Sequence, residues 1–210
     1  EAFDEDRDQL LSSMKDGGVG CIVNVCASAG GFGGTLELIK AYPFVYGAVG
    51  VHPDDAGIMT QDTLDEIRRL SHMEKMVAIG EIGLDYYWDN ESHEIQQKWF
   101  IRQLELAGEV KKPVIIHSRE AAADTMYIGI GGVVTFKNAK KLKDVAAAIP
   151  IEKIVLETDC PYMAPEPYRG KRNQSSYIQY VAEKIAELKE MSPEEVIAVT
   201  EKNARDLYGI

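Results

Sequence analysis

Hydrophobic and polar positions along the chain fall into two patterns: short apolar runs, and longer segments with apolar residues three or four positions apart. A near-continuous apolar run is typical of a strand buried in a parallel sheet, and the wider spacing is typical of an amphipathic helix. The runs predict strands over residues 20–28, 44–51, 77–85, 113–117, 131–136 and 154–159. The spaced segments predict helices over residues 4–14, 35–41, 62–72, from 90 or 92 to 111, and from 192 to about 209.

Strands and helices alternate along the sequence. This order is typical of parallel β/α units, wound either as a barrel or as an open doubly wound sheet. The glycine-rich residues 30–34 lack the Lys-Ser/Thr pair of a phosphate-binding P-loop, so they predict a plain loop. No repeat, low-complexity segment or linker interrupts the pattern, which favours one domain over residues 1–210.

Composition narrows the class of protein. Of 210 residues, 45% are hydrophobic, which suffices for the core of one large domain. No apolar run approaches the ~18 residues of a membrane span, residues 1–10 lack the apolar segment of a signal peptide, and the odd count of three cysteines does not suggest a disulfide framework. These features favour a cytoplasmic protein without membrane contact, and no protein partner is evident. The net charge of −11 argues against a general nucleic-acid-binding surface, but divalent cations in a cleft reverse the local charge.

The first candidate functional residue lies in one stretch, Val77 to Asp85. This stretch is an apolar run around a single acid, Glu81, with Gly80 and Gly83 close by. Carboxylates are rarely buried without a partner, and glycines in a strand allow close approach of another backbone or a ligand. Glu81 is therefore predicted to face a cation at the end of an interior strand.

Other predicted strands also end in metal-binding or acid–base residues: His52, His117 and Asp159. In parallel β/α barrels the carboxyl ends of the strands form the active site, so these side chains are expected to gather with Glu81. Imidazole and carboxylate together suit zinc, manganese or iron, and magnesium where more oxygen is present. Because alternate side chains of a strand point to the same side, Glu157 is expected on the same side as Asp159 and one layer deeper. There it would orient the metal ligands.

The main basic cluster of this acidic chain is YRGKRN, residues 168–173, which follows the strand predicted to end at Asp159. Two interpretations stay open: a solvated charged face, or a loop that positions phosphate. Arg119 and Lys137, each just past a predicted strand, would add positive charge at the same rim. The cationic residues of the cluster are Arg169, Lys171 and Arg172.

Five motifs, in order, closely resemble the TatD family of metal-dependent deoxyribonucleases: GVHP (50–53), GEIGLDYY (80–87), PVIIHSREA (113–121), LETDCPY (156–162) and YRGKRN (168–173). The resemblance runs nearly end to end, including the final NARDLYG. It implies a (β/α)8 TIM-type barrel of the metallo-dependent hydrolase kind. It also implies a site for one to three metal ions and hydrolysis of phosphodiester bonds in DNA.

The resemblance also implies roles for individual residues. Glu81 matches the family's bridging metal carboxylate, His117 a histidine ligand, and Asp159 the ligand after the last strand, with a share in general-base work. His52 matches the GxHP position near metal and phosphate. The implied cofactors are divalent ions, magnesium, manganese or zinc, with two per site in the complete chain.

Two family segments have no counterpart in this sequence. The family's first strand, ending in His-x-His, would precede Glu1, and a strand ending in a His-Cys-Phe-Ser-like motif would lie between residues 117 and 131. The expected barrel therefore lacks strands one and six, with a chain gap near residues 127–129. Either the chain is a short form with an incomplete site, or the sequence omits two disordered segments. The second is favoured because a closed barrel cannot lose two strands without exposing edges.

The expected function is metal-dependent hydrolysis of DNA, on single strands or frayed ends where a phosphate is reachable. The basic cluster, together with Arg119, would hold substrate phosphates without reading bases. Two alternatives stay open. One is hydrolysis of another ester or amide on the same barrel, since fold does not fix function. The other is an inactive short form that acts as a binding protein.

Overall fold

The computed structural model describes residues 2–87, 91–119 and 127–210. The chain divides into two compact units. The central unit comprises residues 21–124 with Gly209, and the terminal unit comprises residues 1–20 and 125–208 with Ile210. The prediction of one domain over residues 1–210, with a gap near 127–129, stays a prediction. The end of the PVIIHSREA motif, from residue 120, lies outside the described residues.

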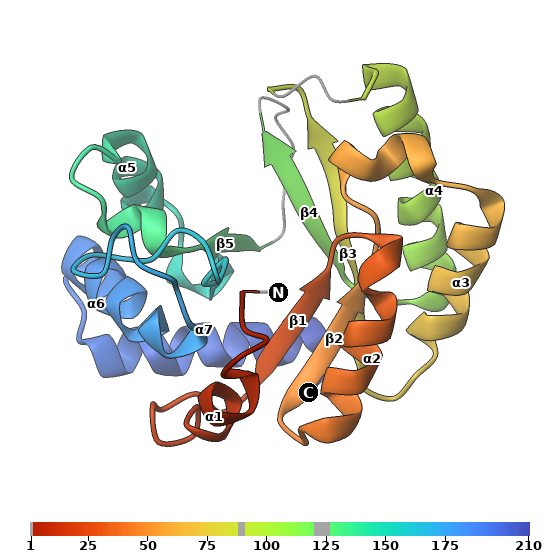
Figure 1. Ribbon diagram of the computed structural model, residues 1–210. Coiled ribbons are helices and arrows are strands. Elements are labelled where there is room, and N and C mark those ends of the chain that lie inside the picture. Colours follow the sequence, from red (N-terminus) through yellow and green to blue (C-terminus); the bar gives the residue numbers. More distant parts are fainter. Residues whose placement is uncertain (1, 88–90, 120–126) are drawn as a thin grey trace. The chain divides into compact units, whose positions relative to one another are not determined.

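The central unit is a parallel sheet of four strands in the order β1-β2-β3-β4, each joined to the next by a helix (Figure 1). The helices α2, α3 and α4 lie along one face of this sheet (Figure 1). The strands are β1 (Ile22–Cys26), β2 (Val45–Val49), β3 (Met76–Asp85) and β4 (Val114–Arg119). The helices are α2 (Phe32–Ala41), α3 (Gln61–Ser71) and α4 (His93–Val110), with 3₁₀ turns at Ala29–Gly31 and Pro53–Ile58.

Local sequence explains where two of these helices begin. The Thr60 hydroxyl accepts a hydrogen bond from the Thr63 amide at 3.1 Å and caps α3. Ser92 caps α4 in the same way, through the Ile95 amide at 3.3 Å. Such caps satisfy amide groups that have no partner within the helix. Both helix starts agree with the sequence pattern to within one or two residues.

The core of the central unit gathers on β3 and the helices over it. Ile79 and Ile82 of β3 have no exposed surface, and Leu70 of α3 packs in the same cluster. Trp99 and Leu106 of α4 complete this side of the core. The packing therefore buries the apolar run 77–85 as the sequence predicts.

Gly83 allows β3 and β4 to approach each other closely. It pairs with His117 of β4, and a Cβ built on it would lie 1.9 Å from the His117 carbonyl oxygen. Its φ of +147° is also a conformation that other residues rarely adopt. Gly83 thus sets the spacing between the strand that carries Glu81 and the strand that carries His117.

The terminal unit holds a separate two-stranded parallel sheet and most of the later helices. Its second core cluster includes Ile130, Ile154, Ile185 and Val196, all at most 1% exposed. Its elements are α1 (Arg7–Ser12), β5 (Ile128–Ile130), α5 (Lys140–Ala148), β6 (Ile154–Leu156), α6 (Ile178–Lys189) and α7 (Pro193–Tyr208), with 3₁₀ turns at Gly132–Thr135, Ile151–Lys153 and Ser175–Tyr177.

A capping box begins α7, the helix that the sequence predicts from residue 192. The Ser192 hydroxyl accepts from the Glu195 amide at 3.2 Å, and the Glu195 carboxylate accepts from the Ser192 amide at 2.9 Å. Helices α5 and α6 were not predicted from the sequence, although the Val181, Ala182, Ile185 and Ala186 side chains on one side of α6 are buried.

Three local predictions are wrong. The strand predicted over 131–136 is instead β5, which ends at Ile130, followed by a 3₁₀ turn. The turn brings Gly132 against residue 163, where a Cβ would meet the Met163 carbonyl oxygen at 2.1 Å. The loop predicted over 30–34 is partly helical, because α2 begins at Phe32 and buries Phe32 and Ile39.

The third concerns β1, which was predicted to be buried. Most of its residues are half-exposed and Val25 is 39% exposed, because among the described strands β1 lies at the edge of its sheet and pairs only with β2.

Among the described residues, no helix is both long and apolar enough to span a membrane. The cytoplasmic location expected from the sequence stays a prediction.

Substituting Gly83 with alanine should destabilise the central unit by more than about 3 kcal/mol, because the new methyl group would overlap the β4 backbone and strain φ. Urea unfolding would measure this. Gly108→Ala is the matched control: Gly108 lies in α4 with open space around it, so alanine should raise the unfolding free energy by about 1 kcal/mol. Equal effects of the two substitutions would contradict the close approach of β3 and β4.

Candidate metal centre

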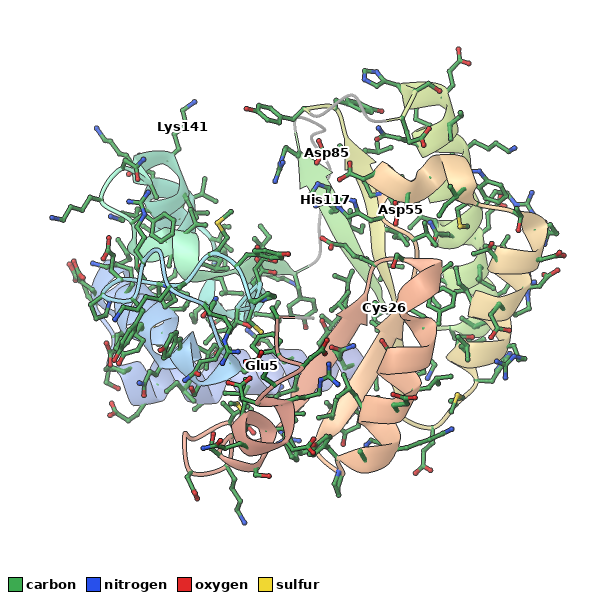
Figure 2. The ribbon with its side chains drawn as sticks, viewed as in Figure 1. Glu5, Cys26, Asp55, Asp85, His117 and Lys141 are labelled. Carbon is green, nitrogen blue, oxygen red and sulfur yellow. The ribbon has the colours of Figure 1, made fainter. Side chains whose placement is uncertain are left out.

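His117 lies between two carboxylates at the carboxyl ends of β3 and β4. Its Nε2 is 2.8 Å from Asp85 Oδ2, and its Nδ1 is 3.3 Å from Glu81 Oε1. Figure 2 shows Asp85 and His117 side by side near the ends of these strands. The strand register explains the arrangement, because Gly83 is paired with His117 and the residues two positions to either side on β3 flank it. Each ring nitrogen therefore faces a different acid.

The charges of this trio are coupled. The hydrogen bond with Glu81 raises the pKa of His117, and burial opposes it without cancelling it. Burial would raise the pKa of Glu81, but the hydrogen bond from His117 and the nearby imidazoles lower it below its usual value. Without a metal, the interaction between the two side chains thus favours the charged forms of both His117 and Glu81. A cation at this position would replace the proton of His117.

His52 follows β2 and lies beside the same group. Its ring centroid is 4.3 Å from that of His117, and burial, with the positive His117 nearby, lowers its pKa. Its Nδ1 accepts a hydrogen bond from the Asp54 amide at 3.2 Å, while the Asp54 carboxylate is 3.6 Å away, too far for a hydrogen bond. In the neutral ring, Nε2 therefore carries the proton and is a donor.

The residues present fit a divalent metal ion. One donor atom each from His52, Glu81 and His117 lie within 4.8 Å of one another. Asp85 accepts from one nitrogen of His117, which leaves the other nitrogen directed to Glu81. This carboxylate–histidine pairing is the usual way in which a metal-bound imidazole is oriented. Imidazole and carboxylate ligands, here His117 and Glu81, suit zinc, manganese or iron.

Asp85 is a functional residue that sequence reasoning missed. It is 1% exposed, accepts from His117 and from the Tyr87 amide, and lies 3.7 Å from the Arg119 guanidinium. Strand period gave a signal: residues 81, 83 and 85 face the same side of β3, and two of them are acids. The sequence assigned a role to Glu81 alone, although the family motif GEIGLDYY also contains this second acid.

Asp159 lies in the terminal unit, three residues beyond β6. The expectation that strand period places Glu157 under Asp159 is wrong, because both follow the end of the strand and Asp159 has φ +56°. The buried Asn173 side chain holds this turn by donating to the carbonyls of Thr158 at 2.6 Å and Tyr162 at 2.7 Å. The roles of Asp159 as ligand and base, and of Glu157 behind it, stay predictions.

The predicted phosphate-binding residues have different surroundings. Arg172 donates to Asp6 and to the Ala2 carbonyl, and its guanidinium lies over the Phe3 ring. Arg169 lies over the Phe136 ring, 4.3 Å from its centroid. Arg119 lies over Tyr87, next to Asp85 in the central unit.

Lys171 is exposed and lies 5.8 Å from the Tyr168 ring centroid. Of the predicted phosphate-binding residues, Arg119 is thus the one that the central unit brings beside the His117 cluster.

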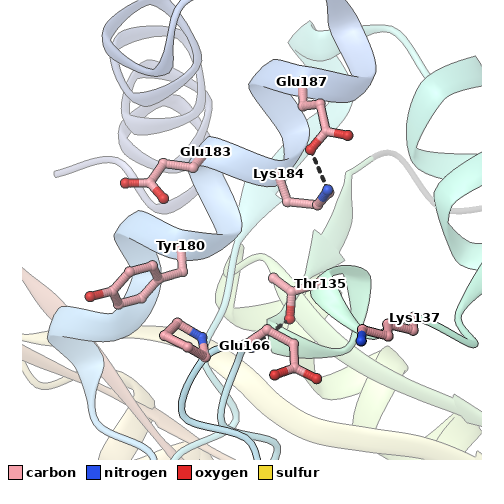
Figure 3. Close-up of a pocket in the computed structure, with 8 residues that line it drawn as sticks. Thr135, Lys137, Glu166, Tyr180, Glu183, Lys184 and Glu187 are labelled. Atoms are coloured by element: carbon pink, nitrogen blue, oxygen red, sulfur yellow. Dashed lines mark hydrogen bonds and ion pairs between the residues drawn. The ribbon is translucent and has the colours of Figure 1, made fainter.

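A pocket in the terminal unit carries Lys137, which was expected at the rim of the site (Figure 3). Lys184 and Glu187 form an ion pair on its wall, and the Thr135 hydroxyl accepts from the Glu166 amide at 2.8 Å. Acidic side chains outnumber basic ones along its lining, so it does not resemble a phosphate site.

Parallel β/α units with an imidazole–carboxylate cluster at the strand ends define a metal-dependent hydrolase. The family model described as "TatD related DNase" matches residues 1–128 and 123–209. The chain therefore belongs to the TatD-related DNase family, as the motifs predicted.

Three known proteins illustrate the relationship. The "uncharacterized metal-dependent hydrolase YabD" of Bacillus subtilis is 41% identical, over the whole of this chain and 95% of its own length. The "3'-5' ssDNA/RNA exonuclease TatD" of Citrobacter rodentium is 27% identical, over 99% and 94%. The crystal structure of YJJV, a TatD homolog from Escherichia coli K12, superposes with a TM-score of 0.90 at 27% identity, over 99% and 93%. This likeness confirms the α/β, TIM-type fold.

The Bacillus subtilis relative has residues within the aligned region that this chain lacks. The alignment with the Bacillus subtilis protein spans 243 positions, 33 more than the 210 residues of this chain. The two family matches meet at residues 123–128, within the segment where the sequence lacks the histidine-bearing strand. A break near residues 127–129 nevertheless stays a prediction.

Asp85→Asn should weaken binding of Mn²⁺ or Zn²⁺ by about 10–100-fold, because a neutral amide is a weaker acceptor than a carboxylate and no longer raises the basicity of the metal-binding imidazole. Isothermal titration calorimetry on the metal-free protein would measure the dissociation constant. Asp65→Asn is the control: Asp65 is an exposed aspartate of α3 paired with Arg68, and its substitution should leave affinity within about twofold. Wild-type affinity in Asp85→Asn would contradict the role of Asp85.

Proposed function

We propose that the protein hydrolyses phosphodiester bonds in DNA, acting on single strands or frayed ends. The observation that carries the proposal is the His52–Glu81–His117 cluster backed by Asp85, because it joins metal ligands to a neutral hydrogen-bond donor. Family membership and the name of the Citrobacter rodentium relative, a single-stranded DNA/RNA exonuclease, support the same chemistry. Arg119 at the rim of the site favours an anionic substrate over a neutral ester or amide.

In this proposal the residues divide the work. Glu81, which matches the family's bridging carboxylate, and His117 would hold the metal, and Asp85 fixes the ring of His117. When bound, a divalent cation supplies Lewis-acid chemistry: it polarises the phosphate and lowers the pKa of water. Magnesium, manganese and zinc all have this capacity. His52 donates its Nε2 proton as a hydrogen bond to a phosphate oxygen.

The remaining roles come from the terminal unit and from the rim. Asp159 acts as a further ligand and as the base that receives a proton from the attacking water. Arg119 and the three cations of the YRGKRN cluster bind substrate phosphates, where contacts position the strand without reading its sequence. These cations are Arg169, Lys171 and Arg172.

Glu81→Gln should lower metal-dependent cleavage of a single-stranded oligonucleotide by more than about 100-fold, because losing a ligand costs more than losing the partner behind it. Cleavage would be followed with Mg²⁺ or Mn²⁺ and with a chelator. Glu66→Gln, an exposed glutamate of α3 paired with Arg69, is the control and should retain activity. Full activity of Glu81→Gln, or cleavage that persists in chelator, would refute the proposal. Activity on carboxyl esters alone would favour the other hydrolase reading.

Substituting the two histidines one at a time distinguishes the residue that binds the metal from the residue that donates a hydrogen bond to the phosphate. His117→Gln should abolish measurable Mn²⁺ binding in calorimetry, because the imidazole that faces Glu81 is lost. His52→Gln should bind Mn²⁺ within about threefold of wild type but raise the KM for oligonucleotide, because its proton-bearing nitrogen serves the substrate. Equal loss of Mn²⁺ affinity in both variants would show that His52 is itself a ligand.

A further inference from the structure

Two buried glutamines of α4, Gln96 and Gln103, pair with backbone at the ends of the strands that carry the site. Both are 1% exposed. Gln103 accepts from the Val51 amide at 2.9 Å and donates to the Val51 carbonyl at 3.1 Å. Gln96 accepts from the Asp85 amide at 2.9 Å and donates to the Asp85 carbonyl at 2.9 Å. Each amide side chain therefore satisfies both polar backbone groups of one residue.

The glutamines provide backbone hydrogen bonds that a neighbouring strand would otherwise provide. Pairing between β2 and β3 ends at Val49 with Ile79, although β3 continues to Asp85. Beyond that point, the chain that follows β2 bonds to the β1 side, with the Gly50 and His52 amides donating to the carbonyls of residues 26 and 27. The Val51 amide points the opposite way, where strand pairing has ended. Gln103 supplies the bond that β3 no longer offers.

The same argument applies to the end of β3. The Tyr86 amide donates to the Arg119 carbonyl of β4, so the neighbouring Asp85 amide points away from β4. Gln96 meets it there and also donates to the Glu91 carbonyl at 3.0 Å. Since Gln96 and Gln103 are seven residues apart, two helical turns, they project from one side of α4.

We propose that Gln96 and Gln103 are positioning residues of the metal site, each acting on a different functional side chain. Gln96 fixes the backbone of Asp85, which orients the ring of His117. Gln103 fixes Val51, whose neighbour His52 faces the substrate phosphate. Buried backbone groups without a partner are costly, so replacing either glutamine lets the strand end move or recruit water. The inference rests on the proposed metal centre.

The two glutamines predict separable effects. Gln96→Leu should weaken Mn²⁺ binding by about tenfold and change the His117 imidazole signals in the nuclear magnetic resonance spectrum of the metal-free protein. Gln103→Leu should change the His52 signals and leave the Mn²⁺ dissociation constant within about twofold. A purely structural role would not divide the effects between two histidines in this way.

The control is Thr35→Val, which removes a buried hydrogen bond between α2 and β1 in the same unit, from the Asn24 amide at 3.0 Å. It should lower stability without changing either histidine or the Mn²⁺ affinity. If the leucine variants do not fold, Gln96→Met and Gln103→Met keep the unbranched shape of glutamine, remove both hydrogen-bonding groups, and should show the same division of effects.

The outcomes distinguish this inference from the proposed metal centre. Unchanged histidine signals and affinity in both glutamine variants, with only the stability loss of Thr35→Val, would overturn it. So would identical effects of the two variants on both histidines. If the wild-type protein bound no Mn²⁺, the metal centre itself would be refuted, and the spectra of the metal-free variants would still decide whether the glutamines position the histidines.

Discussion

The hydrogen bond between Asp85 and His117 is the interaction on which the candidate site depends. It requires β3 and β4 to lie in one register and at short distance, which Gly83 permits. It also requires a carboxylate to be buried almost completely, which is unfavourable unless its partners are in place. The imidazole, the Tyr87 amide and the nearby Arg119 provide those partners. The strand spacing, the helix α4 and the buried acid therefore form one connected arrangement.

The sequence predicted the fold well where the pattern is local. The starts of α3, α4 and α7 and the buried run 77–85 follow from the spacing of apolar residues. It failed where distant contacts decide. The turn after β5 depends on the approach of Gly132 to residue 163, and the exposure of β1 depends on its place in the sheet. Neither contact is visible in a short window of residues.

The same distinction between local patterns and distant contacts decides which residues of the candidate site could be predicted. Glu81 and His117 could be predicted because each is a polar residue that ends or interrupts an apolar run. Asp85 lay in the same motif but was missed, since its partner is 32 positions away in the sequence. Gln103 bonds to Val51 across 52 positions, and nothing in the helix pattern distinguishes it from an exposed glutamine such as Gln97. Residues that support a site from behind are recognised by their partners, which only the fold reveals.

Asp85 has donor partners that do not depend on a bound cation. It accepts from His117 on the Nε2 side and from the Tyr87 amide, and the Arg119 guanidinium lies 3.7 Å away. Glu81, and with it Asp85, raises the pKa of His117. A divalent cation would compete with a proton on the Nδ1 side of the ring, which faces Glu81, and would leave the Nε2 side to Asp85. The second acid therefore lies behind the histidine, where it keeps its partners with or without a cation.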